Sequence, residues 1–437
     1  MADHNVSQTR LYEWLTGDDD SRMCDDIPEG ACNEQPRNFF LHIWAALGNK
    51  LADELSSARL VLPWLMGIIG APVWMVGLLV PIREAGALLP QIFVAGFIRL
   101  KPKRKWVWVT GALAQGLAAL VLAVLALFAS GTLGGALVLA ALILLSLARG
   151  LSSIATKDVL GKTIAKRRRG TLMGWSGSIA GAATLVAGAV LMLFDNRPGN
   201  LVVAILLAIA ASGWLMNAIA AARIQEAPGA VKGGENGWDS IKLGLSLLKN
   251  DRTFLHFNLA RALLLSSALA LPYIALLGQN QSGTDLGGLG ILVVVSGLAA
   301  MIASPLWGKR ADQSSRGVMR DAAIGTAICC LLGASLTWLP GGWTHSIWPY
   351  AAVYALLVIV HHGVRLGRKT YLVDMASQDN RALYVALSNT LTGVLMLIVG
   401  GIIGAFAQWF GSSVLLLILA VTAVGAILSA HQLPEVE

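Results

Sequence analysis

Two apolar stretches near the start of the chain, residues 39–68 and 73–98, contain polar side chains that could do chemistry. These side chains belong to Lys50, Asp53, Glu54, Arg83, Glu84 and Gln91. An ionised group in the hydrocarbon layer of a membrane costs at least about 2.5–3.5 kcal/mol on insertion scales, so it needs a partner, water or a functional reason. The two stretches therefore form the densest polar cluster in an apolar chain.

The acids and the cations of this cluster suggest different roles. Asp53, Glu54 and Glu84 are candidate proton carriers, because a carboxyl group can take up and release a proton when its surroundings change. Lys50 and Arg83 are candidates for attracting an anionic group. The alternative is that Lys50–Glu54 and Arg83–Glu84 are ion pairs that only hold helices together. A purely structural contact could be apolar at lower cost, so the cluster as a whole favours function.

Later apolar stretches contain a second set of candidates. They are Arg149, Arg261, His361, His362 and Asn389. Histidine titrates near neutral pH, so His361 or His362 could relay a proton, pack through a hydrogen bond or bind a metal. Neighbouring helical residues point about 100° apart, and no cysteine or acid stands at ligand spacing. We therefore expect no metal site and no cofactor.

The balance of charge inside the apolar stretches is positive. The cations are Lys50, Arg83, Arg149, Arg261 and Arg365, against the acids Asp53, Glu54 and Glu84. This surplus favours an anionic solute. Arg59 is expected to reach the outer membrane interface with its long side chain, and Arg365 could do the same at the cytoplasmic end.

The composition of the chain is unusually apolar, so each charge inside an apolar stretch is noteworthy. Of 437 residues, 56% are apolar and 13% are charged, whereas an ordinary soluble domain carries about 25% charged residues. This excludes a cytosolic globular protein, a disordered chain and a disulfide scaffold. The net charge of +8 comes from short basic clusters between apolar runs, so it indicates membrane orientation rather than nucleic-acid binding. The chain is predicted to be an integral membrane protein.

A helix needs about 20 mainly apolar residues to cross a bilayer. The sequence predicts twelve such spans: Phe39–Ile68, Val73–Ile98, Trp106–Ala129, Thr132–Ala155, Thr171–Phe194, Asn200–Ala222, Thr253–Gln279, Gly288–Trp307, Val318–Leu339, Ile347–Leu366, Ala382–Phe410 and Ser413–Ala430. Alternate connections carry clusters of Lys and Arg, which stay on the cytoplasmic side. Both termini are therefore expected in the cytoplasm, with the protein in the cytoplasmic (inner) membrane of a bacterium.

The chain divides into four predicted parts. Residues 1–37 form a cytoplasmic leader, 38–222 a six-helix bundle, 223–252 a linker with an amphipathic helix, and 253–437 a second six-helix bundle. The leader contains Cys24 and Cys32 beside acids; their spacing matches no zinc pattern, so an amphipathic cover over the bundle is favoured over a redox or metal sensor.

The two bundles resemble each other in sequence. With an offset of 212 residues, Lys157 falls on Lys369 and Arg169 on Arg381, and several glycines and a serine also match. Two similar bundles around a central site are typical of transporters that rock one half against the other. The all-α fold is thus predicted to be two pseudo-symmetric bundles.

At this point the chain resembles the major facilitator superfamily. The most specific similarity is the run from Gly308 to Asp312, followed by Arg316, which is similar to the family's loop motif after the second helix of each half. The resemblance implies that this loop holds the inner gate. The corresponding loop of the first half keeps the basic residues but lacks the acid. Arg149 with Gly150 is similar to the family's fourth-span motif, whereas the proline motif of drug antiporters is missing from the fifth span.

These observations predict a secondary transporter of a small anionic solute, coupled to protons and working by alternating access. Its partners are the solute, protons and the lipid bilayer, and a monomer is expected. No phosphate-binding loop, nucleophile elbow or zinc motif is present, so no enzyme is expected. The first alternative is a transporter-derived sensor or assembly partner that does not transport. The second is a carrier of a metal or metal complex that uses His361 and His362.

Overall fold

The computed structural model describes Tyr12 and residues 32–90, 98, 100–192, 199–228, 246, 248, 250–282, 286–311, 313–376 and 381–436. These ranges are helical and contain no strand. The first bundle consists of α3 (Gln35–Leu55), α4 (Val61–Ile68), α5 (Val73–Leu88), α7 (Lys105–Phe128), α8 (Gly131–Thr163), α9 (Lys166–Met192) and α10 (Gly199–Arg223). The second consists of α12 (Arg252–Leu263), α13 (Leu265–Ser282), α14 (Leu286–Ala311), α15 (Ser315–Ser335), the 3-10 turn η1 (Gly342–His345), α16 (Ile347–Met375), α17 (Arg381–Phe410) and α18 (Ser412–His431).

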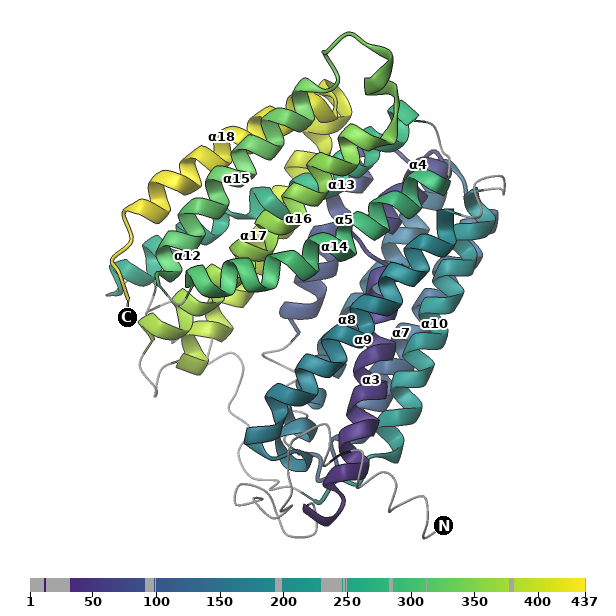
Figure 1. The fold of residues 1–437 in the computed structure, drawn as a ribbon, viewed down its shortest axis with the longest axis vertical. Helices are drawn as coiled ribbons and strands as arrows, with labels where there is room; N and C mark the ends of the chain where they lie inside the picture. Colours follow the sequence, from purple (N-terminus) through teal and green to yellow (C-terminus); the bar gives the residue numbers. More distant parts are fainter. Residues whose placement is uncertain are drawn as a thin grey trace.

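The helices pack as two bundles that meet along part of their length (Figure 1). In the N-terminal half, α7 packs against α8 and α10, and α3 packs against α9 and α10. In the C-terminal half, α15 packs against α16 and α18, and α14 packs against α16. The halves contact each other through α5 with α17, α9 with α14, and α13 with α4 and α5. The predicted all-α fold of two pseudo-symmetric bundles is confirmed.

Ten helices in the described ranges are long and apolar enough to cross a membrane. They correspond one to one with predicted spans three to twelve. The first two predicted spans are not among them, because α3, although 21 residues long, is too polar, and because α4 and α5 have only 8 and 16 residues. The predicted count of twelve is therefore not confirmed, although the chain is a multi-pass membrane protein.

The first half begins with an interrupted helix. The helix stops at Leu55 and resumes at Val61, and Leu60 has a non-helical backbone with φ −133° and ψ −65°. In the second half α12 continues into α13 without such a break, because Leu264 keeps helical backbone angles of φ −67° and ψ −10° and its N–H donates to the carbonyl oxygen of Ala260. The two halves therefore differ at this point.

The halves share a hydrophobic core at one end only. That core joins Trp64 and Trp214 of the first half to Tyr273 and Tyr350 of the second. At the other end each half has a core of its own, one around Trp108 and one around a pair of phenylalanines in α12. We call the first the closed end. We call the second the basic end, because the Lys- and Arg-rich loops lie there. The bundles diverge toward the basic end (Figure 1).

Close backbone contacts seal the closed end. Every residue from 265 to 279 in α13 is buried, and Gln279 donates a hydrogen bond of 2.9 Å from Nε2 to the carbonyl oxygen of Trp64 on the other half. A β-carbon at Gly404 of α17 would overlap the carbonyl of Trp74 in α5. Glycine is thus required where these two helices touch, and the two halves fit tightly at this end.

Candidate functional site

Asp53 connects three helices of the N-terminal half. Its carboxylate on α3 forms ion pairs with Arg83 of α5 and Arg149 of α8, and Asn49 lies 3.4 Å away on its own helix. The side chain of Arg83 is 10% exposed and that of Asp53 is 18% exposed, so this contact is largely buried. Asp53 and Arg83 of the predicted cluster are thus in contact, and the alternative ion pair between Arg83 and Glu84 is not found among the described residues.

Glu84 binds Arg59 instead, with Oε1 and Nη2 2.7 Å apart. The prediction that Arg59 reaches the outer interface is therefore wrong, because Arg59 lies in the interruption between α3 and α4, where it faces the bundle interior. Glu84 also interacts electrostatically with Arg149, Arg365 and Arg368. One acid of the first half thus faces cations from both halves.

Glu54 and Lys50 are exposed on α3. Glu54 interacts electrostatically with Arg59 and Arg149 of its own half and with Arg365 of the other half. The ammonium of Lys50 lies beside Gly177 of α9. Within the described ranges neither residue forms an ion pair, so the alternative Lys50–Glu54 pair is not found.

Arg261 is the buried cation of the C-terminal half. It lies in the last turn of α12 and is 6% exposed. Its guanidinium donates hydrogen bonds to Ser388 Oγ at 2.7 Å and Asn389 Oδ1 at 2.9 Å, both on α17. Among the described residues its Nε has no hydrogen-bond partner. The predicted candidates Arg261 and Asn389 are therefore in direct contact, and both groups that accept hydrogen bonds from the guanidinium are neutral.

Arg365 and Arg368 on α16 complete the group of cations. Both interact electrostatically with Glu84 and Arg59 of the first half. In the sequence, Arg368 stands beside Lys369 in one of the basic clusters that predict a cytoplasmic connection, so its place here was not predicted. The spacing of His361, Arg365 and Arg368, four and then three residues apart, puts them on one helical face, which is a signal that could have found it.

The histidines of α16 have different surroundings. His361 is 2% exposed, and its Nδ1 lies 3.0 Å from Ser267 Oγ near the start of α13. His362 is half-buried. Among the described residues, no group of three or more His, Cys, Asp or Glu side chains could hold a metal ion.

Cys32 is disulfide-bonded, and Cys329 and Cys330 are free and buried.

Several predicted features lie outside the described residues. They are Gln91, Asp312, Cys24 and the amphipathic helix of the linker. Gly308 is described, in α14, with open space where a β-carbon would be. The remaining candidate of the gate loop, Arg316, is in the first turn of α15.

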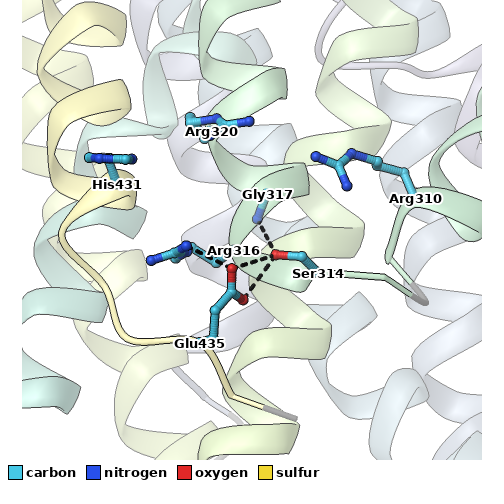
Figure 2. Close-up of a pocket in the computed structure, with 7 residues that line it drawn as sticks. All are labelled: Arg310, Ser314, Arg316, Gly317, Arg320, His431 and Glu435. Atoms are coloured by element: carbon cyan, nitrogen blue, oxygen red, sulfur yellow. Dashed lines mark hydrogen bonds and ion pairs between the residues drawn. The ribbon is translucent and has the colours of Figure 1, made fainter.

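Arg316 binds the C-terminal tail of its own half (Figure 2). Its Nη2 lies 2.7 Å from Glu435 Oε1, and its Nη1 donates to the carbonyl of Leu433 at 2.9 Å. Ser314, which caps the N-terminus of α15, donates to the same carboxylate at 3.0 Å. These groups line a polar pocket of about 200 Å³ together with Arg310, Gly317, Arg320 and His431.

The corresponding loop of the N-terminal half is held in a similar way. Glu226, just after α10, accepts hydrogen bonds from the backbone N–H groups of Arg104 at 3.0 Å and Lys105 at 2.8 Å, where α7 begins. Lys162 of α8 pairs with Glu226 at 3.0 Å and with Asp158 at 3.1 Å. The acids missing from this loop's sequence are therefore supplied from elsewhere in the same half.

The fold is that of the major facilitator transporters. A nucleoside transporter, NupG, has a TM-score of 0.70 with 13% identity over 90% of this chain and 99% of its own. A POT family transporter in complex with 5-aminolevulinic acid has a TM-score of 0.67 with 11% identity, covering 90% of this chain and 95% of its own. The xylose transporter XylE from E. coli, in an inward open conformation, has a TM-score of 0.66 with 12% identity, covering 92% of this chain and 97% of its own.

In sequence, the chain is similar to an uncharacterized protein of Mycobacterium tuberculosis and to one of Mycobacterium bovis. Each is 25% identical over 410 residues, which are 90% of this chain and 77% of the relative. No protein-family model matches the chain.

Proposed function

We propose that this protein is a secondary transporter that moves a small anionic solute through the space between its two halves, coupled to protons. One observation carries the proposal: Glu84 is ion-paired with Arg59 and interacts electrostatically with arginines of both halves, beside the interrupted first helix of the N-terminal half. Charges at membrane depth mark solute and ion pathways, because a structural contact could be apolar at lower cost. The transporter fold supports this interpretation.

The coupling proton is best assigned to Glu54. Asp53 is held by two guanidinium groups and Glu84 by one, so protonating either acid breaks an ion pair. Glu54 has no ion pair within the described ranges and is exposed. Its carboxylate also lies near the carboxylate of Asp53, and two like charges are relieved when one of them takes up a proton.

The basic end is assigned to the cytoplasm, with both termini there. Lysine and arginine in short connections are retained on the cytoplasmic side, and the loops at this end carry Arg104, Lys105, Lys162 and Arg316. The shared core at the closed end then seals the outer side. In this arrangement the solute path opens to the cytoplasm, and the protein lies in the cytoplasmic membrane as a monomer.

Uptake into proteoliposomes tests the proposal. Purified protein is reconstituted, a pH gradient is imposed, and the accumulation of radiolabelled anions is compared with that in liposomes without protein. Accumulation that collapses when a protonophore removes the gradient supports proton-coupled transport. Absence of gradient-dependent flux for every solute contradicts it. A variant that lacks residues 1–31 separates transporter from sensor, because a transporter retains flux without its leader.

A further inference from the structure

The two halves differ in how their membrane arginines are neutralised. In the N-terminal half, Arg59, Arg83 and Arg149 each form an ion pair with an acid of the same half. In the C-terminal half, the guanidinium of Arg261 contacts only a hydroxyl and an amide oxygen. Within the described ranges, Arg365 forms no ion pair, and the same holds for Arg368.

An uncompensated cation at membrane depth is costly, and the cost is largest where it is buried. Arg261 is 6% exposed with an unpartnered Nε, and it interacts with the like charge of Arg368. The acid that reaches all three arginines is Glu84 of the other half. Its carboxylate is already paired with Arg59. Within the described ranges the C-terminal half therefore keeps three arginines, Arg261, Arg365 and Arg368, without an ion pair of their own.

We propose that the C-terminal half holds the charged part of the solute, and that the solute carries at least two negative charges. The inference rests on the proposed function and names its substrate class: a multivalent oxyanion, either a di- or tricarboxylate or a phosphate monoester. Guanidinium groups suit both, because their planar N–H forks match carboxylate and phosphate oxygens. Ser388 and Asn389 orient the guanidinium of Arg261 toward this anion.

The N-terminal half then has the separate task of holding the exchangeable proton on an acid. Because the anion and the proton are bound by different halves, each can favour a different arrangement of the two bundles. A ligand shifts such an equilibrium only through different affinity for the two states.

Anion binding to the purified full-length protein tests the inference. Melting temperature is followed while citrate, succinate, glycerol 3-phosphate, inorganic phosphate or acetate is added at constant ionic strength. A ligand that binds only the native state raises the melting temperature with concentration. We expect at least one multivalent anion to do so at concentrations where acetate does not. The carboxylates and the phosphates in the series distinguish the two kinds of oxyanion.

Variants locate the binding half. Arg365→Gln and Arg368→Gln, which change exposed or half-buried side chains, should lower the apparent affinity by roughly 10-fold to 100-fold, the effect of losing one charge-assisted hydrogen bond. Arg223→Gln removes an exposed charge from the end of α10 and should leave the affinity unchanged. Equal affinities in all three variants, or no preference for multivalent anions over acetate, overturns the inference.

The outcomes also separate this inference from the proposed function. If anions bind through Arg365 and Arg368 but proteoliposomes show no flux, the transport proposal fails and the anion site stands. If flux occurs for a solute whose binding does not depend on these arginines, the anion site fails and the transport proposal stands.

Discussion

Glu226 and Glu435 occupy equivalent places in the two halves. Each follows the last helix of its half, and each carboxylate binds the start of that half's third membrane helix: Glu226 at Lys105 in α7, and Glu435 at Ser314 before α15. An acid at a helix N-terminus is favoured by the helix dipole. The basic loop of each half is thus tied to the end of the same half.

The two acids differ in burial, which gives a prediction for stability. The side chain of Glu226 is 0% exposed and that of Glu435 is 46% exposed. Glu226→Gln should lower the free energy of unfolding by about 1.5–3 kcal/mol, as expected for buried hydrogen bonds to a charged group. Glu435→Gln should cost no more than about 1 kcal/mol, because water screens an exposed pair. Thermal melts of both variants check this order, and a larger loss in Glu435→Gln would contradict it.

Asp53 is predicted to be the acid on which the first half depends most for stability. Asp53→Asn leaves Arg83 and Arg149 without their common counter-charge, and breaking a buried ion pair by removing one partner costs about 3–5 kcal/mol. A marked fall in melting temperature is expected. Asp374→Asn, which changes an exposed acid of α16, should melt like the wild type. If Asp53→Asn also melts like the wild type, the ion pairs do not hold the helices.

Glu54 and Glu84 should differ in their effect on coupling. Glu54→Gln removes the exchangeable proton but no ion pair, so exchange of labelled for unlabelled anion should continue while accumulation under a pH gradient is lost. Glu84→Gln releases Arg59 and should weaken both activities. The two assays, run on the same proteoliposomes, check this. Accumulation that persists unchanged in Glu54→Gln would remove that residue from the mechanism.

The hydrogen bond from Gln279 to Trp64 is predicted to hold the closed end together. Gln279→Ala should favour opening at that end, because it removes a bond between the halves. Ile347, which is buried there against Gly278 and Gly288, can be replaced by cysteine in a background without other thiols and labelled with an impermeant maleimide. Labelling should be several-fold faster in Gln279→Ala, whereas Gln408→Ala, which removes a longer and exposed contact of 3.4 Å, should change it little.

The sequence alone predicted the fold class and ten of the spans, and it named Asp53, Arg83 and Arg149, which the structure brings into contact. It did not predict their pairing. Arg83 and Glu84 are neighbours in sequence, but on a helix they point about 100° apart, so each meets a partner from a different helix. Which partner it meets depends on how the helices pack, and that is a property of the whole bundle.

Two arginines were misplaced for a related reason. Arg59 follows a helix break that hydropathy does not reveal, and the break turns its side chain inward. Arg368 lies near other basic residues, so its charge has the same appearance as an orientation signal. The spacing of Arg368 from His361 distinguishes an arginine of the central cluster from an orientation signal, because it shows which face of α16 the charge occupies.

Transport of a multivalent anion is the central claim, and one measurement tests it most directly. Uptake of labelled citrate, succinate, phosphate and glycerol 3-phosphate is recorded in proteoliposomes under an inward and an outward pH gradient. We expect at least one of these anions to accumulate with wild-type protein in a gradient-dependent way, and Arg368→Gln to reduce that uptake at least tenfold. Uptake of none of them, or uptake indifferent to Arg368, contradicts the account.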